Sequence, residues 1–338
     1  MRTNTLYLHM GTHKTASTTI QSGCVENRAA LLKAGWFYPT SGMYIFGQHN
    51  IAWELAQGRP HPWNHISKNI APRTERGGLA ELMAEIEQAG SPNVILSSED
   101  YENLHFDRIE RLRQQFSNFQ VEVIVYLREQ PAWLQSAWGQ FIKSGFTTLS
   151  FNEWVNQLLK EPISVQRFFG RYDLLLEPWE AVFGKEHVHI RSFSKAVSGD
   201  NIFYDFLRTC RVDGVEQYVV PSDQNIAPGL MTLECSRYLS RDIHSPNQRM
   251  KVCRLVQEWM NEQNIIDGKF NLIGAELYER IQNHFAVSNQ WVARYYLNED
   301  TLFPVKVPGK VSHFTVDELA TVQRDQLTEF VQRSLNEG

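Results

Sequence analysis

The chain has 338 residues, of which 42% are hydrophobic and 21% charged, with a formal net charge of −5 at pH 7. These ordinary globular values exclude a largely disordered, collagen-like or coiled-coil chain. The acidic balance, without a basic domain, argues against a nucleic-acid-binding protein, so any anion site must be local. The four cysteines are dispersed without metal-ligand spacing, which suits a reducing compartment.

The chain begins directly with a strand-forming run, and no stretch approaches 18 uninterrupted apolar residues. We therefore expect a cytoplasmic protein without stable membrane insertion.

Strand and helix signals alternate along the first part of the chain. Short apolar runs, typical of strands buried on both faces, predict a parallel sheet covered by helices, an α/β fold of three α/β/α layers. The strands are expected at residues 6–10, 94–96, 121–127 and 188–193, and the helices at 17–34, 79–86, 107–116, 131–144 and 201–207. Near the end of the chain, Thr315 and Glu318 form a capping box.

The length favours one elaborated domain over residues 1–338. Residues 221–338 are helical in pattern and form a C-terminal subregion. Residues 37–76 are too long for a simple connector. Their aromatic and arginine side chains suit sugars and anionic groups, which makes the stretch a candidate substrate lid, and an irregular surface excursion is an equal alternative. Its informative side chains are His49, Trp53, Arg59, His61, Trp63, His65 and Arg73.

The loop after the first predicted strand is the most informative segment. It starts at Gly11 and contains one lysine, Lys14, followed by the hydroxyls of Thr15, Ser17, Thr18 and Thr19. Backbone N–H groups at a helix start lack intrahelical partners and lie at the positive end of the helix dipole, so this turn suits a phosphate-like anion. The pattern is not GxxxxGK[ST], because two residues separate the glycine from the lysine and no glycine precedes it.

A second informative segment follows the third predicted strand. Arg128 lies just past the strand end, and Ser136 lies eight residues further on in the next helix. Arginine binds phosphate through a two-pronged donor geometry, and ligands of open α/β sheets bind at the carboxyl ends of the strands. This rule places Arg128 at the same sheet edge as Lys14.

Together the two segments resemble sulfotransferases that use 3′-phosphoadenosine-5′-phosphosulfate (PAPS), most closely their bacterial members, which have a P-loop-like fold. The resemblance is strongest over residues 5–40 and 90–200. Arg128 and Ser136 have the spacing of the family's pair for the 3′-phosphate. Ala16 stands where many members have glycine. The resemblance implies that the 5′-phosphosulfate is bound by Gly11, Thr12, His13, Lys14, Thr15, Ala16, Ser17, Thr18 and Thr19.

The resemblance also implies a reaction. An acceptor hydroxyl, on a carbohydrate or glycoconjugate in related proteins, attacks sulfur in line, and the 3′,5′-bisphosphate (PAP) leaves without a metal. Lys14 would stabilise charge on the bridging oxygen. Phe193 occupies a position where relatives often have a tyrosine near the base of the nucleotide.

The acceptor hydroxyl needs a general base, since its own pKa is far above neutral. One candidate is Glu99, in the segment SSEDY after the second strand, and the other is His49, in the segment GQHN after the first helix. The ordinary histidine pKa of about 6.5 favours His49 slightly. Relatives use either residue type at such positions, so both candidates stay open.

Two other functions stay open. A small-molecule kinase would use the same loop for ATP, but the Walker glycine is missing and the pair Glu99–Asp100 is the single contender for Mg²⁺. A non-catalytic nucleotide-binding module would also have such a loop, although Lys14 together with two candidate bases argues against it. The sequence carries no signature of an oligomeric state.

Overall fold

The computed structural model describes residues 4–56, 74–162, 169–199, 201–222 and 227–336. These residues form two compact units. The first unit comprises Met1–Glu129, Arg167–Gln224 and Ala286–Pro304, and the second comprises Gln130–Gln166, Asn225–Phe285 and Val305–Gly338. The expectation of a single domain stays a prediction.

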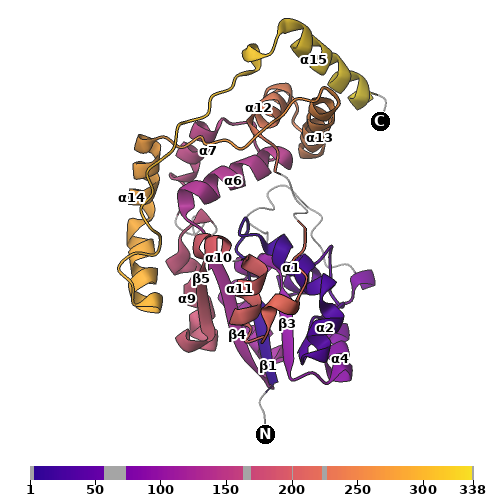
Figure 1. The fold of residues 1–338 in the computed structure, drawn as a ribbon, viewed down its shortest axis with the longest axis vertical. Coiled ribbons are helices and arrows are strands. Elements are labelled where there is room, and N and C mark those ends of the chain that lie inside the picture. Colours follow the sequence, from indigo (N-terminus) through magenta and orange to yellow (C-terminus); the bar gives the residue numbers. More distant parts are fainter. Residues whose placement is uncertain (1–3, 57–73, 163–168, 200, 223–226, 337–338) are drawn as a thin grey trace. The chain divides into compact units, whose positions relative to one another are not determined.

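The first unit is built on a five-stranded parallel sheet with the strand order β2-β3-β1-β4-β5 (Figure 1). The strands are β1 (Asn4–His9), β2 (Trp36–Phe37), β3 (Asn93–Ser97), β4 (Phe119–Leu127) and β5 (Val188–Ser192). In the centre of the sheet, Leu8 is paired with Leu96 on one side and Val123 on the other. Because the strands are parallel, the loops after β1, β3 and β4 share one edge.

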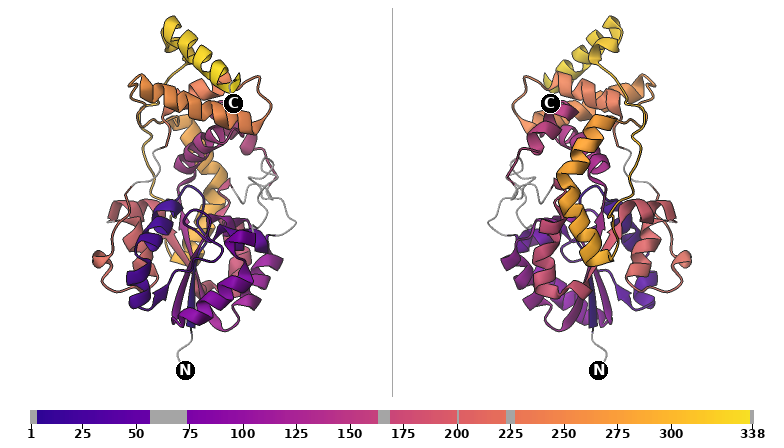
Figure 2. Two further views of the ribbon diagram at one scale, coloured as in Figure 1. Left: turned by 90° about the vertical axis from the view of Figure 1, so that its right-hand side faces the viewer. Right: turned by 90° about the vertical axis from the view of Figure 1, so that its left-hand side faces the viewer.

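Helices cover both faces of this sheet (Figure 2). Successive strand residues point to opposite faces, so that Leu8 packs in one core cluster and Tyr7 in the other. The helices are α1 (Ser17–Glu26), α2 (Arg28–Lys33) and α11 (Ile202–Thr209) on one face, and α3 (His49–Leu55), α4 (Leu79–Ala89), α5 (Phe106–Gln115) and α9 (Tyr172–Phe183) on the other. The structure confirms the predicted three-layer α/β fold with a parallel sheet.

Shorter elements complete the first unit. They are the helix α10 (Phe193–Gly199) and the 3₁₀ turns η2 (Thr74–Arg76), η3 (Glu99–Asn103), η5 (Lys185–His187) and η6 (Val215–Gln217). Phe193, expected at the end of a strand, instead begins α10.

The helix expected over residues 17–34 is divided into α1 and α2 at Asn27. The Asn27 amide donates to the carbonyl oxygens of Gly23 and Val219 (2.8 Å each), and its side-chain oxygen accepts from the Val219 N–H (2.9 Å). These bonds to a segment 192 residues away compete with the helical conformation at this residue. The glycine expected after the helix, Gly35, has a left-handed φ of 94° as a C-cap requires.

The second unit is helical over its described residues. Its helices are α6 (Gln130–Lys143), α7 (Phe151–Leu158), α12 (Leu230–Leu239), α13 (Pro246–Glu262) and α15 (Thr321–Asn336), with the 3₁₀ turn η8 (Val316–Glu318). α13 packs against both α12 and α15, and Trp259 lies in their shared core. The predicted capping box of Thr315 and Glu318 is present and caps η8.

The helix α14 (Ala275–Val292) runs from residues of the second unit into residues of the first and continues as a π-helical segment, Ala293–Leu297. Among the described residues, no helix combines the length and the apolar character that crossing a membrane requires.

Candidate functional site

Gly11 directs the chain from β1 into the loop that precedes α1. Its φ is +90°, and its carbonyl oxygen accepts from the Tyr126 N–H (2.8 Å). A Cβ atom at this position would lie 2.9 Å from the Cα atom of Glu99. Both the backbone conformation and this close approach therefore require glycine. The start of the predicted anion loop is thus packed against the segment that contains one candidate base.

The rest of the loop is held by internal hydrogen bonds. Lys14 and Ala16 have left-handed φ values of 66° and 58°. The hydroxyl groups of Thr15 and Ser17 both donate to the Thr12 carbonyl oxygen, at 2.5 and 3.4 Å. Their protons are therefore used within the loop.

The first turn of α1 has uncapped donors. Ala16 precedes the helix without a side-chain cap, and its carbonyl oxygen accepts from the Thr19 N–H (3.0 Å), so the N–H groups of Ser17 and Thr18 are the ones without a cap. Thr18 and Thr19 are partly exposed in this turn, and their hydroxyl groups donate to none of the residues that the structure describes. The loop and helix start therefore have the donor arrangement of an anion site.

Arg128 lies directly after β4 and reaches this loop. Its Nη1 donates to the Lys14 carbonyl oxygen (2.8 Å), and its guanidinium carbon lies 5.1 Å from the centroid of the Phe193 ring. Burial lowers the pKa of this guanidinium, and none of the described residues gives it a carboxylate partner. Arg191 on β5, by contrast, is paired with Asp205. A partly buried guanidinium without a counter-ion is suited to an anionic ligand.

The backbone around Arg128 is also held in place. The Tyr172 hydroxyl on α9 donates to the Arg128 carbonyl oxygen (2.5 Å). Ser136 is partly buried on α6, which belongs to the second unit, so its pairing with Arg128 stays a prediction.

The two candidate bases lie together at the same edge of the sheet. The Nε2 atom of His49 is 3.9 Å from the Oε2 atom of Glu99, and this oxygen also accepts from the Gln21 amide (2.9 Å). Gln48 explains why His49 lies here, because its backbone N–H donates to the Ser97 carbonyl (2.8 Å) and its Oε1 accepts from the Ser97 N–H (2.9 Å). The start of α3 is thereby attached to the end of β3.

The charges of this pair influence each other. Burial would lower the pKa of His49, but the carboxylates of Glu99 and Asp100 outweigh it and raise that pKa above its ordinary value. Burial would raise the pKa of Glu99, but His49 and His13 outweigh it and lower that pKa. The imidazole and the carboxylate therefore titrate as a coupled pair.

Asp100 lies beside His49 and joins the pair to Trp53 and His13, which the sequence did not predict. Its Oδ2 accepts from Trp53 Nε1 (2.7 Å) and lies 3.3 Å from His49 Nδ1, while its Oδ1 lies 3.7 Å from His13 Nε2. The kinase alternative required Glu99 and Asp100 for Mg²⁺. Since both carboxylates face imidazole groups, their arrangement argues against that use.

A second coupled pair, also missed, joins His13 of the loop to Glu102 of η3. Glu102 is 2% exposed and accepts hydrogen bonds from the His13 backbone N–H (3.3 Å) and from the His13 ring. Burial alone would lower the pKa of His13, but the charge of Glu102 and its hydrogen bond outweigh it and raise the pKa to about 9. The one signal in the sequence was the acidic run that follows the second predicted strand.

The lid expected over residues 37–76 is described in part. His49 and Trp53 lie in the cluster above, whereas a further group lies outside the described residues: Arg59, His61, Trp63, His65 and Arg73. The role of the lid stays a prediction. Within the described ranges, no group of three or more His, Cys, Asp or Glu side chains is arranged to hold a metal ion.

Comparisons with known proteins give few matches. No protein-family model matches the chain. An uncharacterized protein of Archaeoglobus fulgidus is 26% identical over 215 residues, which cover 62% of this chain and 55% of that protein, so the chain spans about half the length of this relative. A crystal structure of a sulfotransferase from Alicyclobacillus acidocaldarius is similar with a TM-score of 0.43 and 17% identity, over 74% of this chain and 95% of that one. A function for the chain has to follow from its own residues.

Proposed function

We propose that the chain is a sulfotransferase that uses PAPS to sulfate a hydroxyl group of a carbohydrate or glycoconjugate. The supporting observation is Arg128, a guanidinium without a carboxylate partner in the described residues, which donates to the backbone of the loop that contains Lys14. One sheet edge thus has two separate anion-binding elements. PAPS needs both, one for its 5′-phosphosulfate and one for its 3′-phosphate, whereas ATP has no phosphate at the 3′ position.

The residues of the loop have distinct roles in this proposal. PAPS, when bound, supplies the sulfuryl group and a phosphate as leaving group. The N–H groups at the start of α1 and the hydroxyls of Thr18 and Thr19 would hold the phosphosulfate. Lys14 would stabilise the negative charge that develops on the bridging oxygen, and Arg128 with Ser136 would hold the 3′-phosphate.

We assign the base to the His49–Glu99 pair, because the two side chains are 3.9 Å apart and shift each other's pKa. The pair would take the proton of the acceptor hydroxyl. The raised pKa of His49 strengthens the imidazole as a base once it is deprotonated. The Ser98 hydroxyl, 2.8 Å from Nδ1 of His49, orients the ring, and the ionised carboxylate of Glu99 stabilises the imidazolium that forms.

Donor binding is tested by thermal unfolding with PAP, adenosine 5′-phosphate, or ATP with Mg²⁺. A ligand that binds the folded state alone raises the melting temperature, by an amount that grows with its affinity. We expect the largest increase with PAP. A larger increase with ATP and Mg²⁺ than with PAP would refute the proposal in favour of the kinase.

Transfer itself is tested with ³⁵S-labelled PAPS and a panel of mono- and oligosaccharides. Lys14→Met should bind PAP but transfer at least about 100-fold more slowly, since it removes a charge that acts on the leaving group. Lys33→Met, on the last turn of α2, is the control and should keep the wild-type rate. Protection by PAP without transfer to any acceptor would favour the non-catalytic module.

A further inference from the structure

Two arginines of the first unit contact Met43. Arg28 at the start of α2 donates from Nη2 to the Met43 sulfur (3.7 Å), and Arg76 at the end of η2 donates from Nη1 to the Met43 carbonyl oxygen (3.4 Å). The Nε atom of Arg76 is buried and has no hydrogen-bond partner, and no carboxylate among the described residues pairs with either guanidinium. A guanidinium has five donors and stays charged at neutral pH. This place therefore suits an anion.

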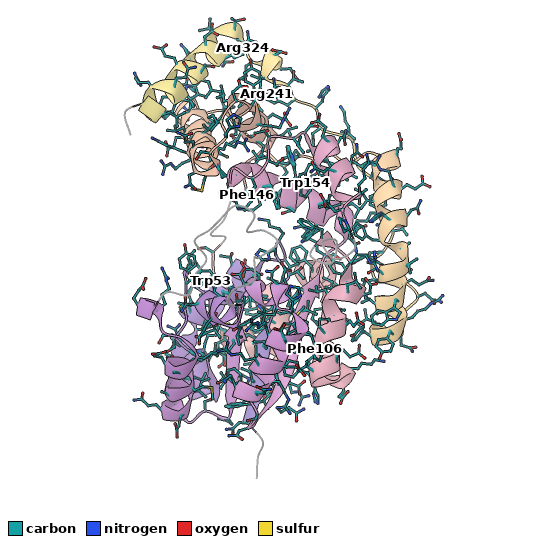
Figure 3. The ribbon with its side chains drawn as sticks, turned by 180° about the vertical axis from the view of Figure 1, so that it is seen from behind. Trp53, Phe106, Phe146, Trp154, Arg241 and Arg324 are labelled. Carbon is teal, nitrogen blue, oxygen red and sulfur yellow. The ribbon has the colours of Figure 1, made fainter. Side chains whose placement is uncertain are left out.

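Aromatic rings connect Arg76 to the candidate base, whereas Arg28 is joined to this group through Met43. The guanidinium carbon of Arg76 lies 4.3 Å from the centroid of the Tyr44 ring. That centroid lies 5.4 Å from the Trp53 ring and 6.3 Å from the His49 ring. Trp53, which extends from α3 (Figure 3), is stacked on His49 with centroids 6.0 Å apart. Tyr44 and Trp53 are both partly exposed, and such rings combine an apolar face with a polar edge that suits sugars.

The acidic residues nearby do not neutralise the arginines. Glu99 and Asp100 face His49, and the indole N–H of Trp53 donates to Asp100. The positive charges of Arg28 and Arg76 therefore have no carboxylate partner among the described residues. If the contact between Arg76 and Tyr44 served only to hold the fold, this surface would not prefer an anionic ligand. A binding site would prefer one, so the two roles can be distinguished by measuring what the surface binds.

We infer that Arg28, Arg76, Tyr44 and Trp53 form an acceptor subsite for a sugar that carries an anionic substituent, a carboxylate, sulfate or phosphate. The inference rests on the proposed function in that the sugar presents its hydroxyl to the His49–Glu99 pair. Arg76 and His49 both approach the same Tyr44 ring. The anionic group therefore belongs on the reacting sugar or on its immediate neighbour.

The inference is tested by calorimetric titration of the full chain without donor. The probes are D-glucuronate, D-glucose 6-sulfate, D-glucose 6-phosphate and, as the uncharged reference, D-glucose. We expect at least one anionic sugar to bind about tenfold or more tightly than glucose, as a charged hydrogen bond supplies. The three anionic probes distinguish which group the site prefers.

Variants then show which residues cause the preference for anionic sugars over glucose. Arg76→Gln should abolish it, Arg28→Gln should reduce it, and Arg76→Lys should retain part of it. Arg208→Gln is the matched control, since Arg208 is an exposed arginine paired with Glu216 on the first unit, and it should bind like the wild type. Tyr44→Leu should weaken glucose and the anionic sugars together, because it removes the ring platform.

Three results would overturn the subsite. One is equal affinity for all four sugars, and another is a preference that survives in the double variant of Arg28 and Arg76. The third is binding of inorganic sulfate as tight as that of glucose 6-sulfate, which would leave no role for the sugar. Protection by PAP, measured on the same samples, reports on folding and on the donor site. If PAP raises the melting temperature but no anionic sugar is preferred, the subsite alone is refuted. If an anionic sugar is preferred and Arg76→Gln abolishes that preference, but PAP does not raise the melting temperature, the proposed donor alone is refuted.

Discussion

The Glu102→Gln substitution tests how charge stabilises the anion loop. It keeps the shape of the side chain and an acceptor for the His13 N–H, but it removes the charge that keeps the His13 ring protonated. The pKa of His13 is raised from 6.5 to about 9 in the folded protein. Since one pKa unit corresponds to about 1.4 kcal/mol, the upper limit of this contribution is about 3 kcal/mol. The His13 side chain is 22% exposed, and partial solvent screening reduces our expectation to about 2 kcal/mol.

The sign of the pH dependence follows from the direction of the shift. The folded-state pKa of His13 lies above the unfolded-state value, so the stabilisation is fully present below the ordinary pKa of 6.5. It decreases as the pH rises towards 9 and is lost above that value. The free energy of unfolding of Glu102→Gln should therefore be about 2 kcal/mol lower than that of the wild type at pH 6 and nearly equal to it at pH 10.

Urea unfolding at a series of pH values measures this difference. Glu216→Gln, which removes an exposed carboxylate paired with an arginine, is the control. It should change the free energy of unfolding only slightly, and this change should not vary between pH 6.5 and pH 9. A difference between Glu102→Gln and wild type that stays constant from pH 6 to pH 10 would refute the charge argument. It would indicate that the lower free energy of unfolding comes from altered hydrogen-bond geometry instead.

Three further substitutions test the site. Arg128→Met should weaken PAP binding by about 10- to 100-fold and leave adenosine 5′-phosphate nearly unchanged in calorimetric titration, and equal weakening of both would contradict its role at the 3′-phosphate. Glu99→Gln should move the acidic limb of the pH–rate profile to lower pH, since the carboxylate raises the pKa of His49, and an unmoved limb would show that the two groups are not coupled. Ala16→Gly should raise the free energy of unfolding by about 0.5 to 1 kcal/mol in urea, because glycine tolerates the φ of 58°, and a decrease would contradict this.

Local patterns were sufficient to predict four of the five strands of the described sheet and part of its helices, but not α3 and α9. The buried runs around Val94 and Val123 showed the strands, because a strand covered on both faces is apolar throughout. The division of the first helix at Asn27 could not be predicted, since its cause is a pair of hydrogen bonds to Val219. The strand β2 has two residues and leaves no pattern.

The residues of the site that directly follow strands were predictable, because the carboxyl ends of parallel strands lie at the same edge of the sheet. That rule placed Arg128 and Glu99 near the loop of Lys14, and the structure has Arg128 bound to the loop backbone. It gave no position for His49, which depends on the hydrogen bonds between Gln48 and Ser97. Pairs that join segments about 90 residues apart, such as His13 with Glu102, have no local signal beyond the acidic run after β3.

The charge balance of the sheet edge leads to one more test. The carboxylates of Glu99, Asp100 and Glu102 lie beside a loop that is proposed to bind a polyanion. Their repulsion would weaken binding of the donor unless protonated imidazole rings of the two neighbouring histidines, His13 and His49, neutralise them. Above the His13 pKa of about 9 the pair with Glu102 carries a net negative charge, so PAP affinity of the wild type should fall about threefold or more between pH 7.5 and pH 9.5.

In Glu102→Gln an amide replaces the carboxylate, so the same pair carries no net negative charge at either pH value. Its PAP affinity should match that of the wild type at pH 7.5 and exceed it at pH 9.5. If the two affinities fell in parallel with pH, the protonated His13 would have no part in shielding the donor, and its bond to Glu102 would serve only to hold the loop.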